Sequence, residues 1–261
     1  MPLSNFEYVP LRLLRRFVVR GSLLQRLASI APYYEVSRNE VSSDPIVGEY
    51  QKHLAMAGAT WRDAELLEVG SGRTNSVGYA LAKAGARSVT CFEPHAGFDP
   101  ERDARLLAAT GGGDALAARV ERVTSLAQVA DASVDLVLSS SVLEHVRDLP
   151  HLMHELRRVL RPAGAMLHLV DYRDHFFKYP FHFLQFSASV WERLLDPGDL
   201  PRWRLSGQLR VIGDAGFAVD VLARERDAGA FAKIAPHLAR DFDATDPDMD
   251  VTHAALFARP A

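Results

Sequence analysis

The chain has 261 residues, of which 48% are hydrophobic, so it can bury a full core in one large domain or two small ones. Its formal net charge of −3 gives no broad positive surface, and we expect no nucleic-acid partner. No apolar run is long enough to predict a membrane span. The single cysteine, Cys91, excludes a disulfide framework and suits a reducing compartment, so a cytoplasmic location is expected.

The first segment of the chain is basic and amphipathic. Arg12, Arg15 and Arg16 stand among leucines, and Glu7 is the only acid before Glu35. The arginines interrupt the apolar run, which is not typical of a signal peptide. Such a helix could lie on a membrane surface, but packing of its apolar face against the domain is favoured. We therefore expect residues 1–60 to form a helical N-terminal lid and residues 61–261 to form the main domain.

From residue 65 onward, apolar runs alternate with helical patterns. This alternation predicts repeated βα units and a mostly parallel sheet. Strands are expected at residues 65–69, 88–92, 118–123, 134–140, 165–170, 218–226 and 252–260. Helices are expected at residues 75–85, 102–112, 149–160 and 207–217.

The alternation breaks over residues 171–205, where phenylalanine, tyrosine, tryptophan and histidine are frequent. A segment that follows the carboxyl end of a strand can cover the ligand crevice of an open α/β sheet. Part of these aromatic side chains must form a core of their own, and the remainder could line a pocket for a planar or sugar-bearing molecule. We expect a cap insert here and a small molecule as the substrate.

Residues 66–94 run from a strand through glycines and a helix to a second strand that ends in an acid. Gly70 and Gly72 directly follow the first strand, where glycines let the backbone approach a ligand beside the free N–H groups of a helix. A carboxylate at Glu93 can accept both hydroxyls of an adenosine ribose. An NAD enzyme fits these features nearly as well, but Asn75 stands where the dinucleotide pattern has its third glycine.

The stretch VDLVLSSSVLEHVRDLPHLMHELRRVLRPAGAMLHLV, residues 134–170, resembles the class I S-adenosylmethionine-dependent methyltransferases, particularly those with an LEHV element and an LxPGG-like turn. That family has an acidic–x–Gly–x–Gly loop, an acid at the end of the second strand and an FD-type fourth strand. The matching residues are Glu68–Gly72, Glu93 and Val134–Asp135. The resemblance covers residues 64–170 with its elements in order.

This resemblance implies a Rossmann-like α/β fold, with a seven-stranded and mostly parallel sheet whose last strand is antiparallel. It also implies S-adenosyl-L-methionine as the cofactor and S-adenosyl-L-homocysteine as its product. The methionine moiety would face Glu68, Gly70 and Gly72, and the ribose would face Glu93. The full set of expected cofactor-binding residues is Glu68, Gly70, Gly72, Thr74, Glu93, Pro94, Ser125, Leu126, Ser139 and Ser140.

Three positions depart from the family pattern. Thr74 replaces the third glycine of the loop, and Ala163 replaces a glycine of the turn. The acid usual after the third strand is absent from residues 124–126. The last departure concerns the part of the site that would recognise adenine.

A sulfonium methyl group is already activated, so the enzyme mainly aligns a nucleophile and excludes water. A hydroxyl acceptor also benefits from a general base, a role that histidine fills well near neutral pH. His145 in the LEHV element is the first candidate. His175 and Asp171, which follow the strand at 165–170, and His182 in the insert are the others. Hydrogen-bonded packing is the alternative role of each histidine.

We expect no metal ion. Asp171, Asp174 and His175 are close in sequence, but no acid on a third strand completes a set of ligands. His151 and His154 also lack a third ligand at a useful spacing.

The sequence therefore predicts a methyltransferase that acts on a small molecule, with transfer to oxygen favoured. The insert is loosely similar to inserts in bacterial methyltransferases of secondary-metabolite and polysaccharide pathways, which indicates secondary-metabolite or sugar biosynthesis. Transfer to the nitrogen of an amine and a non-catalytic cofactor-binding protein of the same fold are the alternatives. The pattern leaves the acceptor and the oligomeric state open.

Overall fold

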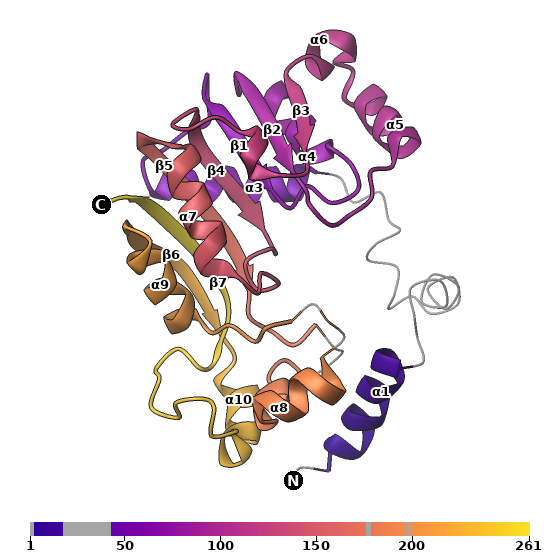
Figure 1. Ribbon diagram of the computed structural model, residues 1–261, viewed down its shortest axis with the longest axis vertical. Helices are drawn as coiled ribbons and strands as arrows, with labels where there is room; N and C mark the ends of the chain where they lie inside the picture. The colour runs from indigo at the N-terminus through magenta and orange to yellow at the C-terminus, as the bar shows by residue number, and fades with distance from the viewer. Residues whose placement is uncertain (1–2, 18–42, 176–178, 197, 199) are drawn as a thin grey trace. The chain divides into compact units, whose positions relative to one another are not determined.

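The computed structural model describes residues 3–17, 43–175, 179–196, 198 and 200–261, which form two compact units (Figure 1). The sheet unit comprises residues 43–171, 206–225 and 253–261. The small unit comprises residues up to 42, residues 172–205 and residues 226–252. Residues 43–60, which the sequence analysis grouped with the N-terminal segment, cluster with the sheet. The part of that segment at residues 18–42 lies outside the described residues, and the lid role stays a prediction.

The strands are β1 (Glu65–Val69), β2 (Ser88–Phe92), β3 (Val120–Val123), β4 (Val134–Ser140), β5 (Leu160–Asp171), β6 (Phe217–Arg226) and β7 (Val251–Pro260). They form one seven-stranded sheet in the order β3-β2-β1-β4-β5-β7-β6. The pairs from β3 to β5 are parallel, and β7 runs antiparallel to β5. The expected Rossmann-like α/β fold is confirmed.

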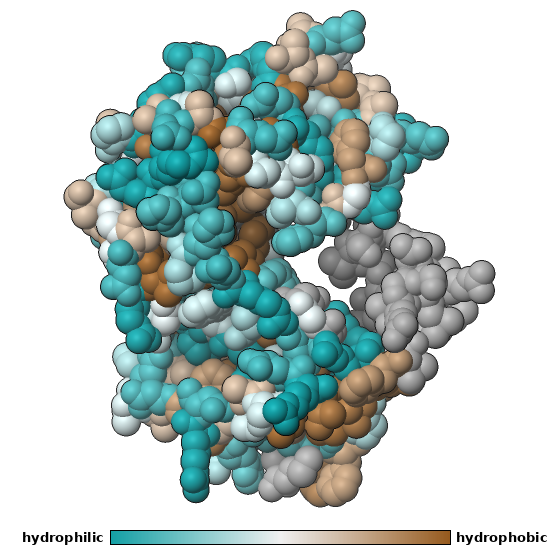
Figure 2. All heavy atoms as spheres, viewed as in Figure 1, coloured by the Kyte–Doolittle hydropathy of each residue, from teal (hydrophilic) through white to brown (hydrophobic). Residues whose placement is uncertain are grey.

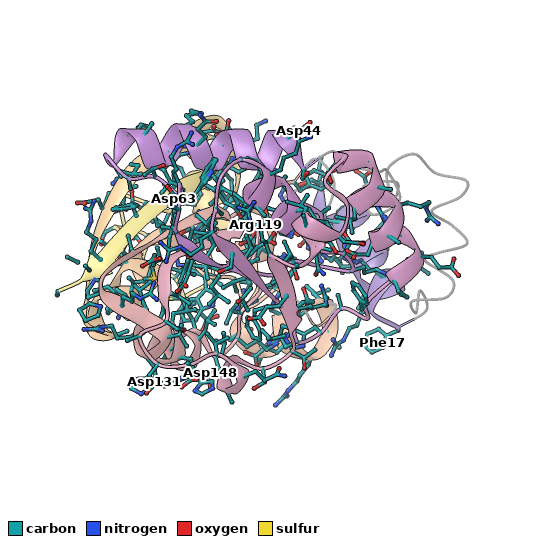
Figure 3. All side chains as sticks on the ribbon, turned by 90° about the horizontal axis from the view of Figure 1, so that it is seen from above. Phe17, Asp44, Asp63, Arg119, Asp131 and Asp148 are labelled. Carbon is teal, nitrogen blue, oxygen red and sulfur yellow. The ribbon has the colours of Figure 1, made fainter. Side chains whose placement is uncertain are left out.

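The helices that follow this pattern are α3 (Asp44–Met56), α4 (Ser76–Lys83), α5 (Pro100–Thr110), α6 (Gly113–Ala117), the short 3-10 helix η2 (Leu126–Gln128), α7 (Leu149–Val159) and α9 (Leu205–Asp214). Figures 1 and 3 show α3 and α7 on opposite faces of the sheet. Asp148, labelled in Figure 3, begins α7 by accepting a hydrogen bond from the backbone N–H of His151 at 3.1 Å. The predicted helices are confirmed, with small shifts at their ends.

The core of the sheet unit lies under α3 and α4. Both helices turn apolar side chains toward the sheet, because their buried residues recur at helical spacing. The buried cluster includes Tyr50 and Leu54 of α3, Tyr79 and Leu81 of α4, and Cys91 of β2. Cys91 is thus a packed core residue, as expected, and burial raises the pKa of its thiol.

The strand expected at 165–170 begins earlier, at Leu160. The backbone of Leu160 is already extended where α7 ends, and it pairs with Val134 before the register shifts to Leu136 and Ala165. A Cβ at Gly164 would lie 2.9 Å from the carbonyl oxygen of Asp135, so only glycine lets the two strands approach here. The expected RPAG turn is therefore the bulged first part of β5.

The small unit is assembled from three stretches of the chain. Its elements are α1 (Asn5–Phe17), η3 (His182–Gln185), α8 (Ala188–Val190), the π-helical turn η4 (Trp191–Leu195), α10 (Ala228–Ile234) and η5 (Ala235–His237). Its buried cluster consists of Phe181, Phe183, Leu184, Trp191, Leu195, Leu200, Ile234 and Met249. Part of the aromatic insert thus forms a core of its own.

Helix α1 packs on this unit through a polar anchor. The buried Arg12 forms an ion pair with Asp174, and Tyr8 donates a hydrogen bond to the same carboxylate. Val9 and Leu13 of α1 also pack against the buried cluster, as expected of the apolar face. Leu3, which precedes the helix, is 84% exposed, and Phe6 is 75% exposed. Figure 2 shows hydrophobic side chains gathered over α1. Within the described ranges, no helix combines the length and apolarity that crossing a bilayer requires.

Candidate functional site

The glycine loop connects β1 to α4, and its two glycines have different roles. Gly70 and Gly72 have φ values of +84° and +64°, a region that favours glycine. A Cβ at Gly70 would lie 2.3 Å from Cγ2 of Val142, so the loop packs directly against the turn that follows β4. No atom lies within 4 Å of a Cβ built at Gly72. The second glycine therefore faces open space that a ligand could occupy.

Glu93 joins this loop to the loop that follows β2. Its Oε2 accepts a hydrogen bond from the backbone N–H of Gly72 at 3.0 Å. Its Oε1 accepts from the N–H groups of His95 at 2.8 Å and Ala96 at 2.9 Å. Pro94, the neighbouring candidate, is exposed. Three N–H groups thus hold the negative charge of Glu93 at the carboxyl edge of the sheet.

Arg122 of β3 holds the same two loops together, and the sequence analysis missed it. Its guanidinium donates to the side-chain oxygens of Ser71 and Asn75, both at 3.1 Å. It also donates to the carbonyl oxygens of Gly72 at 2.5 Å and Ala96 at 3.4 Å. A single cation therefore fixes the shape of the glycine loop.

Glu68 and Thr74, two further cofactor candidates, are buried. Oε2 of Glu68 accepts a hydrogen bond from the Cys91 thiol at 3.4 Å, within the apolar layer under α4. Burial raises the pKa of Glu68 to about 7. Thr74 donates from its hydroxyl to that of Ser76 at 3.4 Å, at the start of α4.

The candidates after β3 and β4 differ in exposure. The Ser125 hydroxyl begins η2 by accepting from a backbone N–H, and Leu126 is buried. The Ser139 hydroxyl is buried 2.7 Å from Nδ1 of His168, and burial lowers the pKa of that imidazole to about 4. Ser140, the next residue, lines an open pocket.

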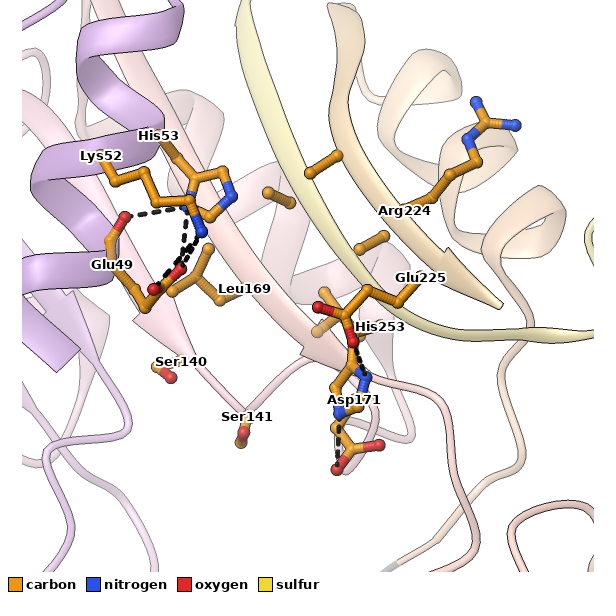
Figure 4. Close-up of a pocket in the computed structure, with 14 residues that line it drawn as sticks. Glu49, Lys52, His53, Ser140, Ser141, Leu169, Asp171, Arg224, Glu225 and His253 are labelled. Carbon is orange, nitrogen blue, oxygen red and sulfur yellow. Dashed lines mark hydrogen bonds and ion pairs between the residues drawn. The ribbon is translucent and has the colours of Figure 1, made fainter. Parts of the chain in front are cut away.

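This pocket, which we call the α3 pocket, lies within the sheet unit and has a volume of about 280 Å³ (Figure 4). It is formed by α3, the carboxyl ends of β4, β5 and β6, and the first part of β7. Its lining residues are Glu49, Lys52, His53, Ser140, Ser141, Leu169, Val170, Asp171, Ala223, Arg224, Glu225, His253, Ala254 and Ala255.

One end of the pocket carries an imidazole between two carboxylates. Nε2 of His253 lies 3.7 Å from Oδ2 of Asp171, and Nδ1 lies 3.1 Å from Oε2 of Glu225. The backbone N–H of Asp171 donates to the buried Glu144 at 3.4 Å. Burial above all, and then the charge of Asp171, raise the pKa of Glu144 to about 8. Of the four catalytic candidates, Asp171 is the one that lines this pocket.

The α3 side of the pocket carries a second imidazole, His53, which is 6% exposed. Its Nδ1 lies 2.9 Å from the carbonyl oxygen of Glu49, one helical turn earlier. Figure 4 shows the ring projecting from α3 above the strands.

The three histidines expected as bases lie elsewhere. His145 is half-buried in the turn after β4, and its backbone N–H donates to the Val142 carbonyl at 2.9 Å. His175 and His182 belong to the small unit. Nε2 of His182 lies 2.7 Å from the hydroxyl oxygen of Ser4, and burial lowers the pKa of this imidazole to about 4. The structure therefore brings Gly72 and Glu93 together, but it does not gather the histidine candidates in one unit.

Residues 67–168 match the family model of a methyltransferase domain. A human protein, thiol S-methyltransferase TMT1A, is 30% identical over 142 residues. The match covers 52% of this chain and 54% of that relative, so the chain spans about half the length of the curated relative.

Two solved structures share the architecture. Phosphoethanolamine N-methyltransferase 2 of Haemonchus contortus, in complex with phosphomonomethylethanolamine and S-adenosylhomocysteine, has 17% identity and a TM-score of 0.52, with 95% of this chain and 59% of that chain covered. The YcgJ protein of Bacillus subtilis has 15% identity and a TM-score of 0.50, with 82% of this chain and 99% of that chain covered. At these identities the likeness shows the fold alone.

Proposed function

Because residues 67–168 match the model of a methyltransferase domain, we propose that the protein is a class I, S-adenosylmethionine-dependent methyltransferase that methylates a small molecule bound in the α3 pocket. One observation carries this proposal. Ser140 and Ser141 line the pocket, and the next residue, Val142, packs against Gly70 of the glycine loop. A donor held at the loop and an acceptor held in the pocket would share this wall, which is the proximity that methyl transfer needs.

We propose S-adenosylmethionine as the cofactor, which would supply an activated methyl group when bound. The residues present fit it. Gly72 leaves open space beside the loop, and Oε2 of Glu93, which accepts one N–H, retains a lone pair for a hydroxyl donor. We propose that Glu93 binds the ribose and that Gly70 and Gly72 admit the methionine moiety.

The remaining cofactor contacts follow the family pattern. We propose that Pro94, Ser125 and Leu126 border the adenosine, and that Ser140 lies near the sulfonium. Glu68, Thr74 and Ser139 would support the residues that contact the cofactor, because their own side chains are buried and hydrogen-bonded to neighbouring residues.

We propose oxygen as the acceptor atom. Asp171 lines the pocket beside His253, and such groups can orient a hydroxyl and share its proton. His145, His175 and His182 remain proposed alternatives to a base in the pocket. An amine acceptor is the second candidate, because the carboxylates of Asp171 and Glu225 would attract an ammonium group.

We propose a cytoplasmic role in the biosynthesis of secondary metabolites or sugars. The buried single thiol of Cys91 suits a reducing compartment. The mixed polar and apolar lining of the α3 pocket suits a compact, hydroxylated molecule.

The test is release of S-adenosylhomocysteine by the full chain in the presence of S-adenosylmethionine and a panel of hydroxylated, amino and thiol compounds. We expect turnover with hydroxylated members. Turnover confined to amines would establish the second candidate. Calorimetric binding of S-adenosylhomocysteine without turnover of any compound would instead identify a non-catalytic protein of the same fold.

A further inference from the structure

We propose that His53 is the catalytic base of the α3 pocket and that the acceptor is therefore a neutral hydroxyl compound. The inference rests on the proposed function, and it assigns removal of the hydroxyl proton to a residue that was not among the bases expected from the sequence. It is carried by the ring geometry of His53, by its burial in the pocket wall and by the polar group at the opposite end.

The hydrogen bond of His53 fixes its tautomer. Nδ1 lies 2.9 Å from the carbonyl oxygen of Glu49, and Oε2 of the Glu49 side chain is the next acceptor at 3.6 Å. A carbonyl oxygen can only accept, so Nδ1 must carry a proton. In the neutral imidazole, Nε2 then has no proton and presents a lone pair.

This second nitrogen is available to a ligand. Among the described residues, Nε2 of His53 has no hydrogen-bond partner, although the residue is 6% exposed and lines the pocket. Because α3 carries the backbone acceptor as well as the ring, the helix presets the direction of the lone pair. A general base needs this kind of fixed orientation toward its proton.

His253, the other imidazole of the pocket, is placed differently. Each of its ring nitrogens faces a carboxylate, Asp171 at 3.7 Å and Glu225 at 3.1 Å. Both ring nitrogens therefore face protein carboxylates, and neither is directed to an acceptor molecule. This cluster therefore suits the binding of a second polar group of the acceptor.

The pocket lining also has an apolar part. Leu169, Ala223 and Ala255 belong to it, and Leu169 pairs with Ala255 across β5 and β7. The acceptor class that fits is a compact molecule with a hydroxyl near His53, an apolar middle and a hydrogen-bond donor near Asp171 and Glu225. A hydroxyl or an ammonium group would serve at that second end.

The proton transfer balances the methyl transfer. The acceptor oxygen forms its bond to the methyl carbon while the carbon–sulfur bond breaks and its electron pair stays on sulfur. Nε2 of His53 takes the hydroxyl proton and becomes an imidazolium. The positive charge of the sulfonium is thus replaced by that of His53, and the proton then passes to solvent.

The first test needs no turnover. Long-range ¹⁵N–¹H NMR of the histidine rings, with His53→Asn to assign the signal, reports the tautomer in the full chain. We expect the neutral His53 ring to carry its proton on Nδ1. A proton on Nε2 would overturn the proposal, because the nitrogen in the pocket would then be a donor.

The second test uses phenol, catechol and 4-nitrophenol as probes, with S-adenosylhomocysteine release as the readout. His53→Asn keeps an amide near the position of Nδ1 but removes Nε2. We expect kcat with phenol or catechol to fall about a hundredfold, while the more acidic 4-nitrophenol, which ionises without help, loses much less. His154→Asn, at an exposed position on α7, is the matched control and should behave as wild type.

The outcomes separate the two proposals. If the wild type methylates the probes but His53→Asn changes kcat only a fewfold, or lowers kcat equally for all three probes, the role of His53 is overturned. The proposed function is not affected by that outcome. Turnover confined to amines or thiols overturns the hydroxyl assignment. No turnover of any compound by the wild type overturns the proposed function itself. His53→Gln, with circular dichroism and binding of S-adenosylhomocysteine, distinguishes loss of the base from loss of the fold.

Discussion

The glycine loop and the α3 pocket lie at the same edge of the sheet but are built in different ways. In the loop, one carboxylate, Glu93, accepts from three backbone N–H groups, and one cation, Arg122, donates back to two loops. In the pocket, side chains from α3, β4, β5, β6 and β7 supply the polar groups. The loop is thus set by backbone geometry, whereas the pocket depends on which side chains five distant segments carry. Substitutions should affect shape and cofactor binding in the first region, and acceptor binding and turnover in the second.

The largest effect should come from Gly70→Ala. The new Cβ would meet Cγ2 of Val142 at 2.3 Å, on a backbone with φ of +84°. Strain and overpacking together should lower the free energy of unfolding by about 3–5 kcal/mol in urea titrations. Gly72→Ala, the matched control, has only the backbone strain and should lose about 1–2 kcal/mol. Equal losses in the two variants would contradict the division of roles between the glycines.

Glu68 should make stability depend on pH. Its pKa is about 7 in the folded protein against an ordinary 4.5, so the folded state favours the neutral carboxyl. This contribution is fully present below pH 4.5 and is lost as the pH rises to about 7, which amounts to about 3 kcal/mol. Glu68→Gln, measured by denaturation across this range, should flatten that slope, and Glu121→Gln, at an exposed position of β3, should leave it in place. An unchanged slope in Glu68→Gln would show that the carboxyl is solvated.

Glu93→Ala should weaken the binding of S-adenosylhomocysteine at least about tenfold, because hydrogen bonds to a charged group contribute about 1.5–3 kcal/mol each. Isothermal calorimetry measures the dissociation constant, and circular dichroism checks the fold. Glu121→Ala, at an exposed position of β3, is the control. A dissociation constant equal to that of the wild type would remove Glu93 from the ribose site.

The smallest effect should come from Asp171→Asn, which keeps the shape of the pocket but removes one of two charges beside His253. We expect KM for the acceptor to rise about fivefold without a change in cofactor affinity. Glu225→Gln should change KM less, because the Glu225 side chain is 76% exposed and such ion pairs contribute little. A loss of cofactor affinity in Asp171→Asn would undo the separation between pocket and loop.

The same contrast explains what the sequence could predict. The strands, the fold and the placement of Gly70, Gly72 and Glu93 follow from local patterns, because the loop and the strand ends lie within thirty residues of one another. Arg122 escaped prediction because its partners are backbone carbonyls and small polar side chains, which leave no motif.

The pocket required the tertiary structure. His53 lies in α3, within the range that was predicted to belong to the N-terminal lid. No local sequence pattern links it to Leu169 or Ala255, which line the same pocket. The position of His253 near Asp171 could have been predicted, because an antiparallel last strand beside β5 puts its first residues at the same edge as Asp171. Periodicity predicted both strands, but not their pairing.

The most direct test of the account is a crystal structure of the full chain with S-adenosylhomocysteine. We predict the ribose hydroxyls on the carboxylate of Glu93 and the sulfur beside residues 140–142, directed into the α3 pocket. A sulfur atom that faces away from Ser140 and Ser141, or a ribose bound elsewhere, would contradict the claim that donor and acceptor share that wall.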